Sequence, residues 1–336
     1  MRLREESEVD QVEGETVVAV CSKPTQVIQV MGFLRGNSRV RCSLFVIEEG
    51  FAAVEAFKES TQDYLGQVFA DVVFVDSRQS LAAEFATLDI DSLLVECDRA
   101  ESYLFYRRFS KNRLTVFEEG IGTYCGVPDR SFLFLRWAKW RFLKLRYGAG
   151  MFFGDSRITT RILVNDRSLY LALNRVGPKK EVLEKKTFLR ELVTLSGYVD
   201  LAALSLYSGK RIVLVLGTKG AALDGGSWRE HEPDADYVLF KAHPHEVSQC
   251  GDVGGGCEML SLASWIPGEL LILALSSICQ ATVVYHYSSS VALYCRTLPN
   301  VTFRNLGYNE RYEKVMSAAS VMDCDFDARG ARQVLE

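Results

Sequence analysis

Short apolar runs alternate with segments suited to helices along this chain, and this alternation constrains the fold more than any other feature. In the first half, the runs cover residues 16–21, 42–47, 71–75, 92–95 and 114–117. Each run is short and bounded by polar or glycine-bearing residues, which is typical of buried strands. Residues 25–34, 50–57 and 81–85 fit helices between them. Strands that alternate with helices in this way predict an α/β fold with a parallel sheet.

The same pattern starts again after a break in sequence character at residues 174–180. Glycine and proline in this break precede a charged segment, residues 181–195, which is predicted to be a helix. Further strand-like runs cover residues 211–216, 237–240 and 281–287, and residues 269–278 are helix-like. A chain of 336 residues is long enough for two hydrophobic cores. We therefore predict a polar tail at residues 1–14 and two Rossmann-like domains, at residues 15–175 and 176–336, which face a central cleft.

Composition excludes several classes of function. The net charge of -4 gives no field that attracts nucleic acid, so we expect no nucleic-acid partner. The nine cysteines form no CxxC pair and lie beside no histidine at zinc-ligand spacing, which indicates reduced thiols in the cytoplasm and no metal site. The N-terminus is acidic where a secretory signal needs a basic start. No run approaches the ~20 apolar residues of a membrane-spanning helix.

Polar residues directly after a strand-like run are candidates for a site, because ligands of open α/β sheets bind outside the carboxyl ends of the strands. Glu118 and Glu119 follow the run at residues 114–117, and Gly120 and Gly122 come next. Adjacent side chains face opposite sides of a strand, so one carboxylate is predicted to be a general base and the other structural. The glycines let the backbone turn close to a ligand. A solvated turn is the ordinary alternative for such an acidic pair.

A histidine follows a second strand-like run. Lys241, His243 and Pro244 come after residues 237–240. An imidazole held by the proline after it is suited to bind a phosphate or to protonate a leaving group near neutral pH. A single histidine is more often an ordinary packed residue, and both interpretations stay open at this point.

Serines follow the run at residues 281–287. Ser288, Ser289 and Ser290 lead into a predicted helix, where hydroxyls and free backbone N–H groups favour a phosphate. A plain serine N-cap is the alternative. Pro267 and Glu269 stand at the start of another predicted helix, where the carboxylate accepts hydroxyls of a ribose or simply complements the helix dipole.

Taken together, these motifs resemble the short signatures of bacterial sialyltransferases: two acids and a glycine, then His-Pro, then a serine pair. The wider sequence, over roughly residues 16–295, is similar to glycosyltransferase family 52, the lipooligosaccharide sialyltransferases, and to related capsule polysialyltransferases. Cys21-Ser-Lys-Pro-Thr-Gln26 is similar to that family's opening Cys-x-Thr-Pro-x-Gln segment. The chain departs from the family with Lys23 at a position where threonine is common, and with three serines in place of two.

The resemblance implies a GT-B fold and an inverting displacement that moves sialic acid from CMP-sialic acid to a hydroxyl of a cell-surface glycan. It assigns the base to Glu119, with Glu118 as the second choice, and assistance of CMP departure to His243. No metal or other cofactor is expected, because hydroxyls, helix N–H groups and an imidazole meet the charge of the leaving phosphate. The implied donor site comprises Ser288, Ser289 and Ser290 at the phosphate and Lys241, Pro267 and Glu269 at the ribose and cytidine.

Other functions fit the same motifs. Nothing in them distinguishes sialic acid from another CMP-activated nonulosonic acid or from Kdo. A transferase that uses UDP or GDP donors fits the two-domain plan but not the motif set. An alternative of a different class is a noncatalytic subunit of a capsule assembly complex that binds a nucleotide or a glycan.

Residues 131–153 are dense in basic and aromatic side chains, with Arg136, Lys139 and Lys144 set among tryptophans and phenylalanines. Such a segment can lie in an anionic membrane interface, which would suit a lipid-linked acceptor and a peripheral position at the inner face of the cytoplasmic membrane. It can equally form a buried helix whose basic side chains reach solvent at its edges. The sequence alone leaves both interpretations open.

Overall fold

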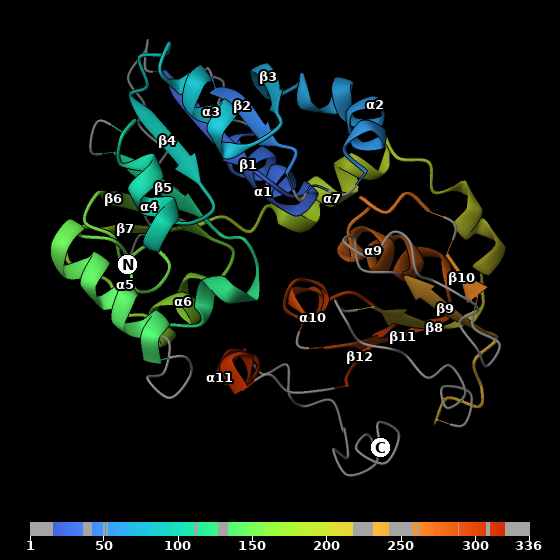
Figure 1. Cartoon of the computed structure of the whole chain (residues 1–336). Coiled ribbons are helices and arrows are strands. Elements are labelled where there is room, and N and C mark those ends of the chain that lie inside the picture. Colours follow the sequence, from blue (N-terminus) through green and yellow to red (C-terminus); the bar gives the residue numbers. More distant parts are fainter. Residues whose placement is uncertain are drawn as a thin grey trace, which may run out of the picture. The chain divides into compact units, whose positions relative to one another are not determined.

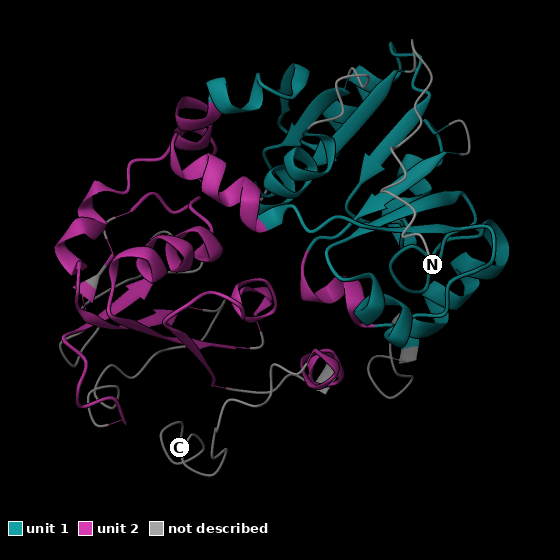
Figure 2. Ribbon diagram, turned by 180° about the vertical axis from the view of Figure 1, so that it is seen from behind, with its two compact units in different colours: residues 1–50, 62–119, 126–188 teal, residues 51–61, 120–125, 189–336 magenta. Residues whose placement is uncertain are grey.

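The computed structural model describes residues 16–35, 42–49, 51, 53–110, 113–126, 134–217, 231–241, 258–260, 262–287, 289–306 and 310–319. The chain forms two compact units (Figure 2). Unit 1 comprises residues 1–50, 62–119 and 126–188, and unit 2 comprises residues 51–61, 120–125 and 189–336. The predicted domain boundary at residues 175–176 therefore falls inside unit 1, and two short segments of the predicted first domain belong to unit 2.

Unit 1 is built around a parallel sheet, as the alternating pattern predicts. Within the described residues this sheet has seven strands in the order β3-β2-β1-β4-β5-β6-β7 (Figure 1). The strands are β1 (Val17–Cys21), β2 (Cys42–Ile47), β3 (Phe69–Val75), β4 (Ser92–Val95), β5 (Leu114–Phe117), β6 (Thr159–Val164) and β7 (Glu181–Glu184). Every residue of β1, β4 and β5 is buried. Strands buried on both faces are mostly apolar, with only Ser92 in β4 and Thr115 in β5 as polar residues here, which is why these three could be predicted.

The prediction of one helix over residues 181–195 is wrong for its first part. Residues 181–184 form β7, which pairs in parallel with β6, and the helix α7 (Phe188–Ser196) begins only afterwards. The backbone N–H and C=O groups at the edge of β6 need partners. Pairing with that edge decides the conformation of this short segment, because strand preference depends strongly on tertiary context.

Three helices of unit 1 begin at residues typical of a helix start. The described helices of this unit are α1 (Pro24–Leu34), α3 (Arg78–Phe85), α4 (Ala100–Tyr106), α5 (Phe134–Tyr147) and α6 (Arg167–Leu173), and α2 (Val54–Leu65) ends in unit 1. Pro24 opens α1, where a proline sacrifices no helical hydrogen bond. Ser77 caps α3 by accepting the N–H of Ser80 at 3.2 Å, and Asp166 caps α6 by accepting the N–H of Leu169 at 2.8 Å.

A buried carboxylate fixes the loop between β4 and α4. Asp98 is fully buried, and it accepts hydrogen bonds from the backbone N–H groups of Gly154 at 3.0 Å and Ser156 at 2.9 Å. The Thr159 hydroxyl donates a third hydrogen bond at 2.7 Å. These three hydrogen bonds stabilise the negative charge of the Asp98 carboxylate, which would otherwise be destabilised by burial away from water. They tie the loop after β4 to the segment between α5 and β6.

Unit 2 contains a second parallel sheet, as predicted. Among the described residues its strands are β8 (Arg211–Leu216), β9 (Tyr237–Lys241), β10 (Glu258–Met259), β11 (Ala281–His286) and β12 (Val301–Asn305), in the order β10-β9-β8-β11-β12. Its helical elements include η1 (Ile121–Tyr124), most of α7, η2 (Ala202–Tyr207), α9 (Gly268–Ile278), α10 (Ser290–Cys295) and α11 (Glu310–Ala318). The predicted α/β class with two Rossmann-like units is confirmed. Of the helices in the described segments, none combines the length and apolar character needed to span a bilayer.

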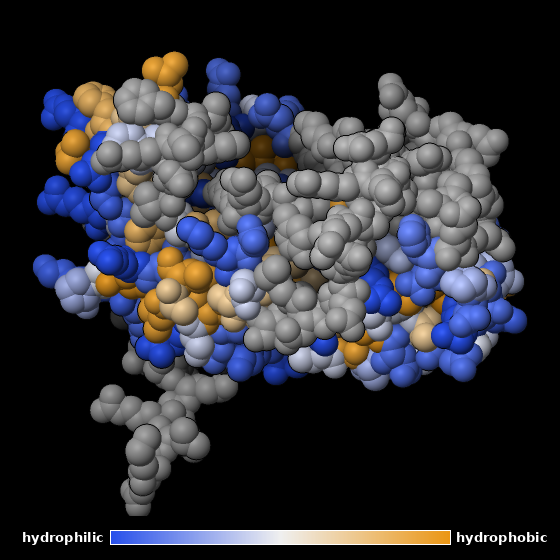
Figure 3. Space-filling view, turned by 90° about the horizontal axis from the view of Figure 1, so that it is seen from below, coloured by the Kyte–Doolittle hydropathy of each residue, from blue (hydrophilic) through white to orange (hydrophobic). Residues whose placement is uncertain are grey.

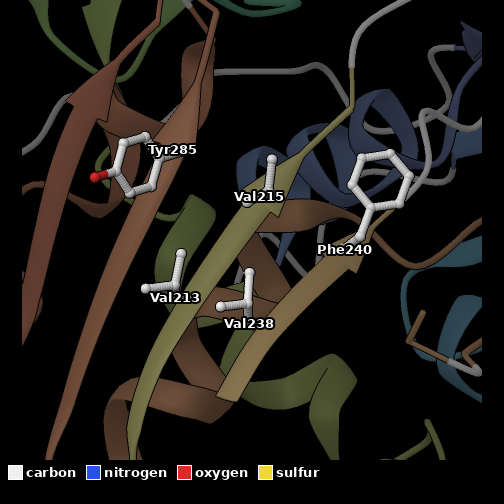
Figure 4. Close-up of a cluster of buried hydrophobic side chains, with 5 residues drawn as sticks. All are labelled: Val213, Val215, Val238, Phe240 and Tyr285. Atoms are coloured by element: carbon white, nitrogen blue, oxygen red, sulfur yellow. The ribbon is translucent and has the colours of Figure 1, made fainter. Parts of the chain in front are cut away.

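A cluster of buried side chains holds the centre of the second sheet together (Figure 4). Val213 of β8 is in register with Val238 of β9, and Val215 is in register with Phe240. Tyr285 of β11 is in register with Val215 on the other side of β8. Residues two apart on a strand share a face, so the five side chains form one apolar layer. This layer fixes the carboxyl ends of β8, β9 and β11 relative to one another.

The strand order of each sheet reverses at its first strand. In unit 1 β1 lies between β2 and β4, and in unit 2 β8 lies between β9 and β11. Ligands of open α/β sheets bind beyond the carboxyl ends of the strands at such a point. The segments that follow these strands are therefore where a functional site is expected.

Candidate functional site

The two acids that follow β5 have different surroundings, and Glu118 is the buried one. Its Oε2 accepts the backbone N–H of Asn165 at 2.6 Å. The Asn165 side chain in turn donates to Gln29 Oε1 at 3.0 Å. Through these bonds Glu118 links β5 to the loop after β6 and to α1, which is the geometry of a structural carboxylate.

Glu119 retains access to solvent, with 23% of its side chain exposed. Gln26 Nε2 lies 3.4 Å from Oε2, and Arg99 Nη2 lies 3.8 Å from Oε1. The other end of the Gln26 amide accepts the backbone N–H of Ser22 at 2.7 Å, which turns the Gln26 nitrogen toward Glu119. A carboxylate that is held in place and still reaches solvent is suited to take a proton from a bound hydroxyl.

A third carboxyl group, which the sequence analysis does not predict, lies near Glu119. Glu96 follows β4 directly and is 5% exposed. The Tyr106 hydroxyl donates to Glu96 at 3.2 Å, and Arg78 Nη2 lies 3.5 Å from its other oxygen. Burial is the main reason that the pKa of Glu96 is raised to about 7; the negative charge of Glu119 adds to the rise, and Arg78 and Tyr106 oppose it. Glu96 therefore changes charge near neutral pH.

Arg99 is the second residue of this site that the sequence analysis misses. Its guanidinium lies 5.9 Å from the centre of the Trp140 ring, which is cation–π distance. The next residue, Ala100, is buried and has a left-handed φ of 45°. Such strain in a residue other than glycine persists only where the surroundings impose it. The signal was available, because residues 96–99 follow a strand-like run just as Glu118 does.

In unit 2, Ser289, the N-cap residue of α10, forms hydrogen bonds through both its hydroxyl and its backbone N–H. Ser289 Oγ accepts the N–H of Val291 at 3.4 Å and so caps the helix. The backbone N–H of Ser289 donates to Nδ1 of His286 at 3.1 Å. Burial lowers the pKa of His286 to about 4, so its imidazole is neutral and can accept this bond. His286 was not among the predicted site residues, and it positions one that was.

A buried cation and a buried carboxylate lie near each other at the carboxyl edge of the unit 2 sheet. Lys241 ends β9 and is 8% exposed, and Glu269 in the first turn of α9 is 4% exposed. Burial lowers the pKa of Lys241 to about 8, and the Glu269 carboxylate opposes this shift. Burial also raises the pKa of Glu269, against the effects of its own backbone N–H, the Ser290 hydroxyl and Lys241. The Ser290 hydroxyl donates to Glu269 Oε1 at 3.2 Å.

A close contact of Gly268 shows that α9, β8 and α10 converge at this edge. A Cβ built on Gly268, the first residue of α9, would lie 3.6 Å from the Leu216 side chain and 3.4 Å from the Val291 side chain. Leu216 ends β8, and Val291 is the second residue of α10. Pro267 is buried at the N-cap position of α9. The predicted donor residues on these elements therefore lie around one place.

Gly120 also lies at this place, although it was predicted in the first domain. A Cβ on Gly120 would be 3.6 Å from both Cβ and Oγ of Ser290, and its φ of 133° favours glycine. Both residues belong to unit 2. Gly122 lies inside η1, and its φ is not in the left-handed region, so only the first of the two glycines needs its conformational freedom.

The structure thus gathers the predicted site residues into two groups. Unit 1 holds Glu118 and Glu119, with the unpredicted Gln26 and Arg99 beside Glu119, and unit 2 holds Gly120, Gly122, Lys241, Pro267, Glu269, Ser289 and Ser290. His243, Pro244 and Ser288 lie outside the described residues. Where the chain is described, no three histidine, cysteine, aspartate or glutamate side chains are grouped to hold a metal ion.

No protein-family model and no curated protein matches the chain. Solved structures similar to it include the glycosyltransferase SnogD from Streptomyces nogalater, at 11% identity over 95% of this chain and 93% of that one, with a TM-score of 0.43. The wall teichoic acid polymerase TagF is similar at 12% identity over 98% and 83% of the two chains, with a TM-score of 0.46. TcCGT1, in a complex with UDP, is similar at 9% identity over 96% and 94%, with a TM-score of 0.41.

Proposed function

We propose that this chain is an inverting glycosyltransferase that moves sialic acid from CMP-sialic acid to a hydroxyl of a cell-surface glycan. The observation that carries the proposal is the gathering of Lys241, Glu269 and Ser290 at the carboxyl edge of the unit 2 sheet. A cation, a carboxylate and a hydroxyl at the carboxyl edge of a parallel sheet suit a nucleoside monophosphate. Gly120 contacts Ser290, and Glu119, the proposed base, precedes Gly120 in the chain.

In the proposed donor complex, the phosphate of CMP lies against Ser289 and Ser290, and we move Lys241 from the ribose and cytidine, where the resemblance put it, to the phosphate. The Ser290 hydroxyl turns from Glu269 to the phosphate, and the freed Glu269 oxygen accepts the ribose hydroxyls. The phosphate thereby adds a second anion beside the buried ammonium group of Lys241, next to the Glu269 carboxylate. These groups supply the positive charge and the donors that the leaving phosphate needs, so we propose that no metal ion takes part.

The proposed reaction is a single displacement at the anomeric carbon. Glu119 accepts the proton of the acceptor hydroxyl while that oxygen forms its bond to the anomeric carbon. The bond from this carbon to the phosphate oxygen breaks on the opposite side, and its electron pair leaves with CMP, which inverts the anomeric configuration. Gln26 and Arg99 hold the Glu119 carboxylate during the transfer. We further propose that His243 assists the departure of CMP by a hydrogen bond to the phosphate.

The two adjacent acids provide a matched test. Glu119→Gln should lower kcat for transfer from CMP-sialic acid at least about 100-fold, because a general base contributes that much or more. Glu118→Gln should retain most of the activity, because glutamine still accepts the Asn165 N–H that Glu118 accepts. CMP release in the presence of a panel of glycan acceptors measures both. Full activity of Glu119→Gln would show that Glu119 is not the general base. If only Glu118→Gln lost activity, Glu118 would be the base instead.

Nucleotide binding separates the proposed donor from its alternatives. CMP should raise the thermal unfolding temperature more than UDP or GDP at equal concentration, because a ligand stabilises the folded state according to its affinity. Transfer from CMP-Kdo but not from CMP-sialic acid would identify a different acidic sugar. CMP binding without turnover of either donor would identify a noncatalytic binding subunit instead of a transferase.

A further inference from the structure

The helix α5 leaves large apolar side chains exposed to solvent. Leu135 is 83% exposed, Phe142 59% and Leu145 76%. With Tyr147, they make up four of the nine large apolar side chains that are exposed among the described residues. Leu135 and Phe142 are two helical turns apart, and Leu145 is one turn further, so these three form a row along one side of the helix.

The other side of α5 is attached to unit 1. Leu143 is buried at 7% exposure. The Trp140 ring faces the Arg99 guanidinium at 5.9 Å, and the backbone carbonyl of Tyr147 accepts the Tyr103 hydroxyl at 2.6 Å. These contacts fix the rotation of α5 about its axis. Its apolar row therefore points away from the core of unit 1.

Basic side chains border the apolar row. Arg141 and Arg146 are exposed, and Lys139 is exposed while it pairs with Glu101. The sequence of α5, FLRWAKWRFLKLRY, contains no aspartate or glutamate. In the space-filling view from below, hydrophobic side chains lie among strongly hydrophilic ones on the left, the side on which α5 lies in Figure 1 (Figure 3).

We propose that the row of Leu135, Phe142 and Leu145, together with Arg141 and Arg146, is a docking surface for an anionic membrane. A lipid interface takes apolar side chains at the acyl boundary and attracts the cations beside them with its headgroups. A second copy of the chain would bring the same cations face to face. A nucleic acid would pair with the cations but leave the leucines and the phenylalanine uncovered. The surface is independent of the proposed transfer reaction.

Vesicle flotation of the full-length protein tests this surface. The protein should float with vesicles of equal parts phosphatidylcholine and phosphatidylglycerol and not with phosphatidylcholine alone. Flotation should decrease between about 0.1 M and 1 M salt, because the screening length falls from ~10 to ~3 Å. Arg141→Glu with Arg146→Glu should weaken binding at least about tenfold, because each lost base removes a substantial share of the attraction. Leu135→Ser with Leu145→Ser keeps every charge and should also lose binding.

The matched control is an equivalent pair on unit 2. Leu206 is 73% exposed and Lys210 is exposed, so Leu206→Ser with Lys210→Glu combines one loss of an apolar side chain and one charge reversal elsewhere on the surface. This variant should bind vesicles like the unmodified protein. Equal flotation with both kinds of vesicle, no flotation at all, or equal weakening in the control would overturn the proposal. A dimer in solution that Leu135→Ser with Leu145→Ser abolishes, without vesicle binding, would assign the surface to a second copy.

Discussion

Binding of CMP should weaken as the pH rises through 8, because a bound phosphate selects the charged form of Lys241. Burial lowers the pKa of this lysine to about 8 in the unliganded protein. With that value, the charged fraction falls from roughly three quarters at pH 7.5 to roughly one tenth at pH 9, so Kd for CMP should rise about eightfold. If the phosphate restores an ordinary lysine pKa, binding at pH 8.5 also takes up roughly 0.7 proton.

Isothermal titration calorimetry with CMP, in buffers that differ in ionisation enthalpy, measures both quantities. Lys241→Arg is the matched control, because a guanidinium keeps its charge across this range. Its Kd should stay nearly constant from pH 7.5 to 9. Lys241→Met should bind CMP weakly at every pH. A constant Kd in the unmodified protein, or the same rise in Lys241→Arg, would refute the role of Lys241 and leave the assignment of Glu119 untouched.

Three further predictions concern stability, each measured by urea unfolding. In the unmodified protein, the pKa of Glu96 is raised from 4.5 to about 7, so between these pH values the folded state holds a proton that the unfolded state has released. The unmodified protein therefore loses stability as pH rises, and Glu96→Gln, which lacks the carboxyl group, does not show this loss. Its free energy of unfolding relative to Glu96→Gln should fall by about 2.5 kcal/mol between pH 5 and 8, and a constant or rising difference would contradict the assignment. Gly120→Ala should lower the free energy of unfolding by about 1–3 kcal/mol because of its left-handed φ. Gly122→Ala should lower it clearly less, and equal losses would show that the conformation of Gly120 is not strained for alanine. Asp98→Ala leaves several buried donors without an acceptor and should cost about 3 kcal/mol or more, and a loss below about 1 kcal/mol would mean that water replaces the carboxylate.

Most of the described strands could be predicted from the sequence, but β6 inside the first sheet and three of the four edge strands could not. The mainly apolar runs at residues 92–95 and 114–117 coincide with β4 and β5, because a strand covered on both faces carries few polar residues, here Ser92 and Thr115. At the edges, β7 was predicted as helix, and β10 and β12 were not predicted at all. These strands have partly exposed residues, and their conformation depends on the neighbour with which they pair.

For the residues that follow the strands, the local sequence also predicts some features, whereas others depend on contacts in the folded structure. The strand-end rule proposed Glu119, Lys241 and Ser290, because it needs only the end of a strand and a polar side chain, and the start of a predicted helix proposed Glu269. Glu96 also directly follows a strand, but it was not proposed; its raised pKa depends on burial, which the local sequence does not show. No local pattern assigns Gly120 to the second unit, since its contact with Ser290 joins residues that are far apart in the sequence.

The chain enters unit 2 at residues 51–61 and 120–125 long before most of that unit has been synthesised. Phe57 is 1% exposed in the finished protein, where its ring centre lies 5.2 Å from that of Trp265. A ribosome that adds 5–20 residues per second would need roughly 10–40 s to pass from one aromatic residue to the other. During this interval Trp265 is not yet available to pack against Phe57, although the described strands of the unit 1 sheet are synthesised before Trp265 is. We therefore expect truncated chains that end near Phe188 to aggregate or to recruit chaperones, and separate expression of the two halves cut there to yield less native protein than the intact chain.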